Sequence, residues 1–191
     1  MQNVIDAYEH LVLEDLTEQC LATQVVYQGN LLSVRCDEVQ LPNNEVAKRE
    51  YIVHPGASAI IPLGRQNEII LERQYRYATQ SHHVEIPAGK RDHGESFLEA
   101  AQRELEEETG LTATSWTPLG VLDLCIGYSD EKIHYFVAQG LEWGEAQWDT
   151  EEKIQLFSLP LKDAYQWILE GKITDAKTVA GLLLYRLWHN K

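Results

Sequence analysis

The sequence predicts an α+β domain in which a mixed sheet carries a helix on each side. Three observations favour this class. Strand-like apolar runs separated by turn residues occupy most of the chain. One amphipathic helix interrupts these runs at residues 97–109, and two more helices, at about 161–170 and 175–189, follow the last strand.

The strand-like runs also suggest a separate N-terminal part. Residues 1–20 mix apolar and acidic residues and predict a loose or short helical arm. Runs at 23–27 and 31–41 flank a Gln-Gly-Asn turn signal and predict a hairpin. We therefore divide the chain into an arm with a hairpin, 1–46, and a main domain, 47–191. Further strands are expected at 48–53, 57–62, 68–75, 84–86, 116–124, 132–137 and 154–158, with an acidic loop at 140–152.

The length and charge of the chain restrict its partners. Its 191 residues suffice for one domain with a sizeable core and an N-terminal appendage. Thirty acidic against 16 basic residues give a formal net charge of −14. Such a surface repels nucleic-acid backbone and anionic membrane, so we expect neither as a partner. A small phosphorylated substrate is compatible with this charge if a metal and local arginines offset the field.

The cysteines and the N-terminus predict a cytoplasmic protein. Cys20, Cys36 and Cys125 are odd in number and lack C-x-x-C spacing, so we expect reduced thiols. The first residues lack the basic-then-apolar pattern of a signal peptide, and no apolar run reaches the length of a membrane span.

Local signals set both ends of the helix at 97–109. Ser96 is expected to be its N-cap, and Glu99, three residues later, completes a capping box. Gly110 can adopt the left-handed conformation that ends a helix. The helix then has about three to four turns.

This helix is predicted to have adjacent apolar and acidic faces, because spacings of three and four residues return to one face. The apolar face comprises Leu98, Ala101 and Leu105, and the acidic face comprises Glu104, Glu107 and Glu108. Like charges at this spacing weaken a helix by a few tenths of a kcal/mol per pair, and a bound divalent cation would offset that repulsion. The alternative is a solvated acidic face on which Arg103 bridges Glu99 and Glu107.

The last helix is expected to begin after a cap at Thr174 and to pack through one apolar face. That face comprises Val179, Leu182, Leu183 and Leu187.

The acidic helix belongs to a longer pattern. It runs from Gly89 through five residues to Glu95, through seven residues to Arg103-Glu104-Leu105, through one residue to Glu107-Glu108, and through one residue to Gly110-Leu111. This pattern resembles the Nudix box at every defined position. The resemblance implies a Nudix-type α/β/α sandwich with a mixed sheet, here with an N-terminal β-hairpin extension. It also implies a loop–helix–loop that binds Mg²⁺ or Mn²⁺ and positions a nucleoside diphosphate linked to another group.

Stretches outside the box resemble the ADP-ribose pyrophosphatase subgroup, namely residues 49–57, 72–77, 85–90 and 171–178. The implied reaction converts ADP-ribose to AMP and ribose 5-phosphate. Ile126 stands where many members of the subgroup have a proline, which leaves another ADP-sugar, a GDP-sugar or a dinucleotide as alternatives. An inactive Nudix domain that senses a nucleotide is a further alternative, which loss of a box glutamate would mark; none is lost.

The resemblance implies roles for the box residues. Glu104 and Glu108 are expected to ligate the metal, with Glu107 ligating or orienting and the Ala88 carbonyl completing the site. Glu95 and Arg103 are expected to form an ion pair that fixes loop to helix. Gly89 would provide the backbone geometry near the metal.

Residues around the box are candidates for substrate binding and proton transfer. Arg76 is a candidate phosphate clamp, with a surface arginine at a strand end as the alternative. Glu85 is expected to contact the metal or the substrate. The general base is expected on a loop after the box, either at Glu151 and Glu152 or at Glu131, which is also a candidate substrate contact. The alternative for the first two is a flexible, solvated acidic loop.

The subgroup resemblance further implies a homodimer in which N-terminal strands reach across to the partner. The hairpin predicted at 22–41 is the candidate for that role.

Overall fold

The computed structural model describes residues 14–144 and 153–190. The chain divides into two compact units, Met1–Val53 and His54–Lys191. Residues 1–13 of the arm predicted at 1–20 lie outside the described residues, and so do the candidate bases Glu151 and Glu152; the end of the predicted arm, from Gln19, belongs to the first strand.

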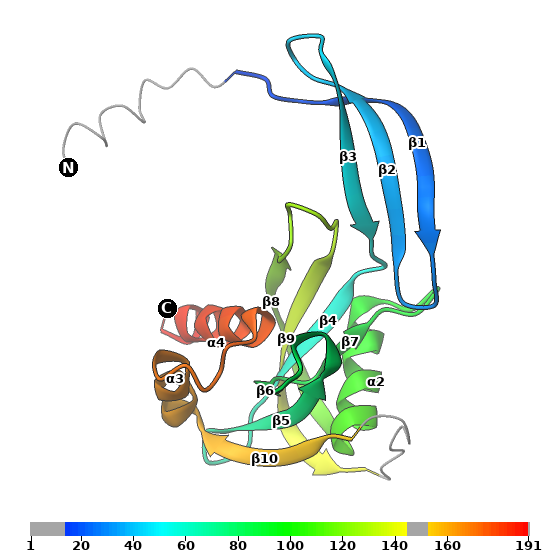
Figure 1. The fold of residues 1–191 in the computed structure, drawn as a ribbon. Coiled ribbons are helices and arrows are strands. Elements are labelled where there is room, and N and C mark those ends of the chain that lie inside the picture. The colour runs from blue at the N-terminus through cyan, green and yellow to red at the C-terminus, as the bar shows by residue number, and fades with distance from the viewer. Residues whose placement is uncertain (1–13, 145–152, 191) are drawn as a thin grey trace, which may run out of the picture. The chain divides into compact units, whose positions relative to one another are not determined.

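The first unit is a three-stranded antiparallel sheet in the order β1-β2-β3 (Figure 1). Strands β1 (Gln19–Gln28) and β2 (Ser33–Gln40) form the predicted hairpin, whose turn is closed by the Gly29 N–H donating to the Leu32 carbonyl at 2.9 Å. Strand β3 (Val46–Val53) pairs with β2 along its whole length. All residues of β1 are exposed, its apolar ones included.

The second unit contains two sheets, in the orders β7-β4-β9-β8 and β10-β5-β6. Strands β4 and β9 are parallel and all other neighbours are antiparallel, so the sheet is mixed as predicted. The strands are β4 (Ala57–Pro62), β5 (Glu68–Arg76), β6 (Ser81–Glu85), β7 (Ala88–Lys90), β8 (Leu111–Asp123), β9 (Lys132–Trp143) and β10 (Gln155–Pro160). A 3₁₀ turn, η1 (Tyr77–Thr79), joins β5 to β6.

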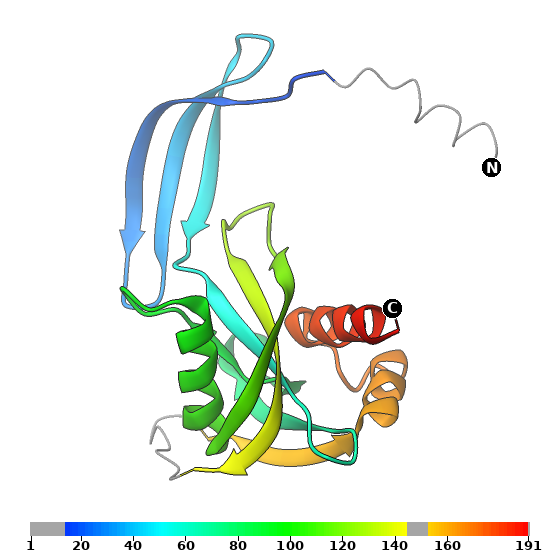
Figure 2. The ribbon, with the colours of Figure 1, turned by 180° about the vertical axis from the view of Figure 1, so that it is seen from behind.

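Helices cover both sides of these sheets (Figures 1 and 2). Helix α2 (Phe97–Thr109) lies on one side, and α3 (Leu161–Leu169) and α4 (Ala176–His189) lie on the other. Strand β4 is buried on both faces because its side chains alternate between the two layers. Ile60 packs in the cluster with α2, whereas Ala59 and Ile61 pack in the cluster with α3 and α4.

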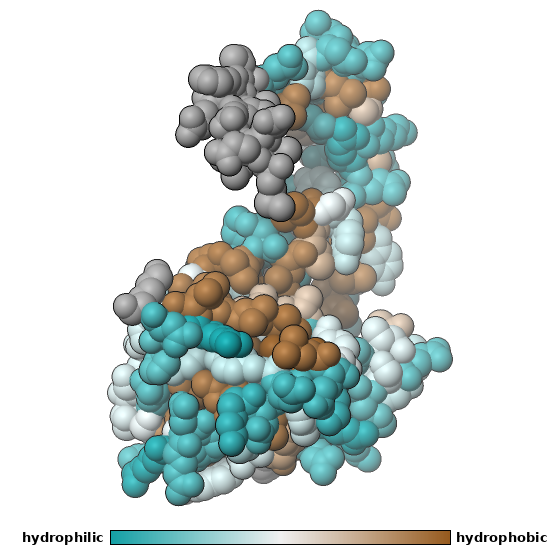
Figure 3. All heavy atoms as spheres, turned by 90° about the vertical axis from the view of Figure 1, so that its left-hand side faces the viewer, coloured by the Kyte–Doolittle hydropathy of each residue, from teal (hydrophilic) through white to brown (hydrophobic). Residues whose placement is uncertain are grey.

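Two of the predicted apolar faces were wrong in part. In α2, Ala101 and Leu105 are fully buried, but Leu98 is 39% exposed. In α4, Leu182 is buried, while Leu183 and Leu187 are exposed, and Figure 3 shows hydrophobic side chains gathered over this helix. Periodicity gives the phase of an apolar face, but how far each helix is rotated on its sheet decides which residues at its edges are covered.

Several predicted boundaries also differ from the structure. The N-cap of α4 is Asp175, not Thr174, and its side chain accepts the Thr178 N–H at 2.9 Å. Strand β9 continues to Trp143, into the segment expected to be an acidic loop. Strand β8 begins at Leu111, directly after the glycine that ends α2. None of the helices within 14–144 and 153–190 is both long and apolar enough to cross a membrane.

Replacing Leu105 by Ala should destabilise the protein by about 2–5 kcal/mol, because it leaves a cavity between α2 and the sheet. Leu98→Ala removes the same atoms from an exposed position of the same helix and should change stability by less than about 0.5 kcal/mol. Urea unfolding of both variants measures the difference. Equal losses would contradict the burial pattern of α2.

Candidate active site

The ends of α2 are fixed as the sequence predicted. The Ser96 side chain accepts the Glu99 N–H at 3.2 Å, and the Glu99 carboxylate accepts the Ser96 N–H at 2.8 Å, so the capping box is confirmed. Gly110 has φ 69°, and its N–H donates to the Glu106 carbonyl at 2.8 Å. These two caps fix the residues at which α2 begins and ends, so that Glu104, Glu107 and Glu108 all lie within the helix.

Arg103 is the central cation of the box. Its guanidinium donates to both oxygens of Glu95 at 3.0 and 3.1 Å, to Glu104 at 2.8 Å and to Glu107 at 2.8 Å. It also donates to the Lys90 carbonyl at 2.9 Å, which joins the loop before α2 to the helix itself. The expected pair with Glu95 is present, and the hydrogen bond from Arg103 lowers the pKa of the Glu95 carboxyl.

Glu99 is absent from this network, contrary to the solvated-face alternative. It is engaged in the capping box, so Arg103 contacts only one of the two glutamates that the alternative assigned to it.

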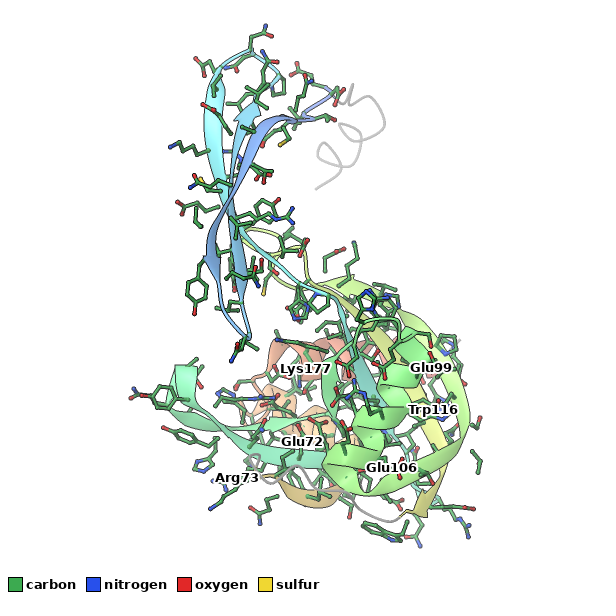
Figure 4. The ribbon with its side chains drawn as sticks, turned by 90° about the vertical axis from the view of Figure 1, so that its right-hand side faces the viewer. Glu72, Arg73, Glu99, Glu106, Trp116 and Lys177 are labelled. Carbon is green, nitrogen blue, oxygen red and sulfur yellow. The ribbon has the colours of Figure 1, made fainter. Side chains whose placement is uncertain are left out.

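Glu108 points into the protein and carries a perturbed carboxyl. It is 8% exposed, and one of its oxygens accepts the Ala88 N–H at 2.9 Å. Burial raises its pKa well above the ordinary value, and the nearby carboxylates of Glu72 and Glu104 raise it further. Glu72, from β5, is fully buried, and Figure 4 shows it beside α2 with Lys177.

Gly89 has no side chain, and the Glu104 carboxylate occupies the space that a Cβ would need. A Cβ at this position would overlap the Glu104 carboxylate. Strand β7 places Ala88 and Gly89 opposite Ala59 and Ser58 of β4, so the backbone is held here by sheet pairing. The absence of a side chain lets Glu104 lie against this backbone.

This arrangement fits a hard divalent cation by its chemistry. The predicted donors Glu104, Glu107, Glu108 and the Ala88 carbonyl are all oxygens, which Mg²⁺ and Mn²⁺ prefer. The repulsion that raises the pKa of Glu108 is the repulsion that a cation would relieve. Within the described ranges no three acidic, His or Cys side chains already converge as a metal-binding group, and Arg103 holds Glu104 and Glu107.

A third buried carboxylate, that of Glu85, lies at the end of β6. Glu85 receives two hydrogen bonds from Arg76, both at 2.8 Å, and one from Lys177 at 2.8 Å. Burial alone would raise the pKa of Glu85, but these hydrogen bonds outweigh it and lower the pKa to about 2. Arg76 is therefore not a lone surface arginine: its fork is oriented by Glu85 while its side chain remains 41% exposed.

Arg76 and Glu85 also line a cavity of about 400 Å³. Its other lining residues come from η1, β6 and the start of α4, namely Thr79, His83, Thr174, Asp175, Ala176 and Lys177. A cavity of this size and polarity suits part of a polar small molecule.

Comparison with known proteins identifies the family. The NUDIX domain family matches residues 53–182, and a nucleoside diphosphate sugar hydrolase N-terminal domain matches residues 18–52. The chain belongs to the Nudix family. Its Nudix fold is also that of a solved ADP compounds hydrolase, which aligns with a TM-score of 0.82 and 28% identity over 92% of this chain and 96% of that one.

Two curated Nudix relatives span almost the full chain. An ADP-ribose pyrophosphatase of Bacillus subtilis (strain 168) is 33% identical over 92% of this chain and 96% of its own length. A methanol dehydrogenase activator of Bacillus methanolicus is 39% identical over 89% of this chain and 93% of its own length. The predicted fold class and Nudix family are thus confirmed.

Two residues singled out from the sequence, Glu131 and Ile126, lie on the connection between β8 and β9. Glu131 is placed beside His54, with 3.7 Å between the Glu131 oxygen and His54 Nε2. The His54 N–H donates to the neighbouring Asp130 at 2.7 Å. The same connection carries Ile126, which is exposed.

Sequence reasoning missed two residues of this Nudix site. Glu72 lies in the stretch 72–77 and Lys177 in the stretch 171–178, here called the tail motif; the resemblance of these stretches to the subgroup assigned neither residue a role. The fold buries Glu72 and leaves the Lys177 side chain 13% exposed. Glu72 follows the apolar run 69–71 but is itself followed by Arg73 and Gln74, so its strand gave no local signal that this charge is buried. A larger cavity of about 560 Å³, between α3 and α4, is lined by none of the predicted site residues.

Replacing Gly89 by Ala should weaken binding of Mn²⁺ by about 10- to 100-fold, the range for changes next to metal ligands, because the new Cβ displaces the Glu104 carboxylate. Mn²⁺ titration followed by electron paramagnetic resonance measures the affinity.

Gly64→Ala is the matched control, because its Cβ would overlap the Glu68 carboxylate in a turn outside the Nudix box. It should leave Mn²⁺ affinity unchanged. Equal effects of the two substitutions would show that Gly89 has no special relation to the metal.

Proposed function

We propose that this Nudix protein hydrolyses the pyrophosphate bond of a nucleoside diphosphate linked to a sugar, with ADP-ribose as its substrate and AMP and ribose 5-phosphate as products. The observation that carries the proposal is the completed box on α2. Its glutamates lie beside an open glycine backbone, with Glu108 buried against Ala88 and Glu72. The relative named ADP-ribose pyrophosphatase supports the choice of substrate.

The chemistry requires neutralisation of phosphate charge and a positioned water. Glu104, Glu108 and the Ala88 carbonyl would hold Mg²⁺ or Mn²⁺, with Glu107 as a further ligand or an orienting group. When bound, the cation would offset the charge of the phosphate oxygens and ease deprotonation of water. Arg103 orients the two glutamates that it contacts, and the exposed edge of Arg76 would donate to a phosphate oxygen.

The bond changes are those of a hydrolysis. Water adds to one phosphorus, and the bond from that phosphorus to the bridging oxygen breaks. The leaving group is itself a phosphate, so it needs little protonation. The proton of the water goes to a carboxylate, for which Glu131, Glu151 and Glu152 remain the candidates.

Glu108→Gln should lower kcat by about 100-fold or more, because it removes a charged metal ligand worth several kcal/mol in the transition state. Glu106→Gln is the control: it makes the same change on the same helix, at the undefined position of the box, and should leave turnover unchanged. Steady-state release of AMP from ADP-ribose measures both. Full activity of the Glu108 variant would remove the metal assignment.

The pH dependence of kcat in variants of the candidate bases shows which of them accepts the proton. Replacing the true base by Gln should remove the acidic limb of the kcat profile, since that limb reports protonation of the base. Glu131→Gln and the double replacement of Glu151 and Glu152 are compared with the unmodified protein. A replacement that leaves both the rate and the limb unchanged excludes that candidate.

A substrate panel tests the substrate itself. ADP-ribose, ADP-glucose, GDP-mannose, NADH and diadenosine polyphosphates are compared by kcat/KM under the same Mg²⁺ concentration. Preference for ADP-ribose supports the proposal and makes Ile126 a neutral variation. Preference for another member moves the specificity to the 125–131 loop. Turnover of none, with Mg²⁺ bound, favours the nucleotide-sensing alternative.

The relative named methanol dehydrogenase activator favours one second candidate, in which this chain acts on a dehydrogenase. Adding the protein to an NAD-dependent alcohol dehydrogenase, with and without Glu108→Gln, distinguishes the two functions. Stimulation that depends on Glu108 would connect activation to hydrolysis.

We also propose that the protein is a homodimer formed through its first unit and that it acts in the cytoplasm. The exposed apolar side chains of β1, including Val25 at 54% exposure, support the first proposal. Free Cys20, Cys36 and Cys125 support the second.

Val25→Lys should convert the dimer into a monomer, because it places a charge in the apolar contact. Gln24→Lys, at the next position of the same exposed strand, should leave the dimer intact. Light scattering after size-exclusion chromatography gives the mass of each. A monomeric unmodified protein would exclude the dimer.

A further inference from the structure

The tail motif at 171–178 contacts the segment that leads into the Nudix box. Its last three residues begin α4, and Asp175 caps this helix by accepting the N–H of Thr178 at 2.9 Å and its hydroxyl at 2.6 Å. The first turn of α4 is therefore rigidly ordered by its own sequence. The proposed reaction assigns this turn no role.

The first turn of α4 binds both backbone polar groups of Ile86. The Thr178 hydroxyl accepts the Ile86 N–H at 2.9 Å, and Lys177 Nζ lies 3.3 Å from the Ile86 carbonyl. Lys177 also donates to the preceding Glu85 carboxylate at 2.8 Å. Two residues after Ile86, the Ala88 N–H donates to Glu108. Residues 85–88 thus join the first turn of α4 to the buried glutamate of the box.

Lys177 is a partly buried cation among carboxylates. Its side chain is 13% exposed and forms ion pairs with Glu85 and with Asp175, the latter at 3.1 Å. Burial lowers the pKa of Lys177, but the two carboxylates outweigh burial and raise it, so the side chain stays charged. Burying a charge in this way is costly unless its partners are held in place, so the lysine and the Glu85 segment fix each other.

Close packing leaves little freedom in this contact. A Cβ at Gly181, one turn further along α4, would lie 2.9 Å from the Tyr135 ring and 3.1 Å from the Ile86 side chain. The Tyr135 hydroxyl donates to the Lys177 carbonyl at 3.2 Å. Helix α4 is thus set directly against Ile86 and β9, and its first turn is not free to shift away from the box.

We propose that Lys177 is a positioning residue for the metal site: together with Thr178, it holds residues 85–88 so that Ala88 faces Glu108 in the geometry that binds a divalent cation. The inference rests on the proposed function. Lys177 acts through Ile86 and Glu85, and it does not itself touch the metal or the reacting phosphorus.

The test uses the full chain and Mn²⁺ as the probe, measured without substrate. Lys177→Met removes the charge at similar length, and Lys177→Arg restores a cation. Thr178→Val removes the hydroxyl that accepts the Ile86 N–H, and Thr178→Ser restores it. Lys172→Met is the control, because Lys172 pairs with Glu170 at the surface outside the site. Mn²⁺ affinity, kcat, KM and the unfolding temperature without metal are measured for each.

Lys177→Met and Thr178→Val should each weaken Mn²⁺ binding by about 10- to 100-fold, the range for residues that orient metal ligands. Their kcat should fall more than KM rises. Lys177→Arg and Thr178→Ser should recover much of the affinity, and Lys172→Met should match the unmodified protein. If Lys177→Met does not fold, Thr178→Val and Thr178→Ser decide the result by the same criteria.

A lower unfolding temperature with unchanged Mn²⁺ affinity in the folded variants would overturn the proposal, since it would leave Lys177 with a structural role alone. Weakened Mn²⁺ binding in the variants, together with no turnover by the unmodified protein, would support the positioning role while the hydrolase proposal failed.

Discussion

The structure depends on keeping several carboxylates close together in the interior of one domain. Glu72 and Glu85 face each other directly on β5 and β6, and both are buried. Glu108 points toward the same region from α2, and its pKa reflects both its burial and the charge of Glu72 and Glu104. Like charges opposite one another in a sheet are destabilising, and burial strengthens their repulsion. Such a cluster requires cations at fixed positions.

Three basic residues meet this requirement, and each comes from a different part of the fold. Arg103 lies on α2 and forms ion pairs with Glu104 and Glu107. Arg76 lies at the end of β5, and Lys177 lies in the first turn of α4. They do not bring the pKa of Glu108 back to its ordinary value: burial raises it most, and the charges of Glu72 and Glu104 raise it further. The remaining imbalance suits a site for a divalent cation, because a metal supplies the positive charge that the protein leaves out.

Local cations also matter for the substrate. A pyrophosphate approaches a chain of net charge −14, so long-range attraction cannot bring it to the site. Short-range groups must do so, and Arg76 is suited to this because Glu85 orients its fork while part of the side chain stays exposed. The same pairing keeps Glu85 ionised, with a pKa of about 2, at any pH at which the protein would act.

Features that depend on residues near one another in the chain could be predicted from the sequence. Both ends of α2 follow from Ser96, Glu99 and Gly110, because capping involves only neighbours within one turn. The spacing of the Nudix box and the hairpin follow from equally local patterns, whereas the parallel pairing that makes the sheet mixed joins β4 to the distant β9. Tertiary packing also determines which carboxylates meet. Glu85 and Lys177 are 92 residues apart, and no periodicity relates them. The exposure of Leu98 and Leu187 was decided in the same way, because the rotation of a helix on its sheet is set by packing between elements.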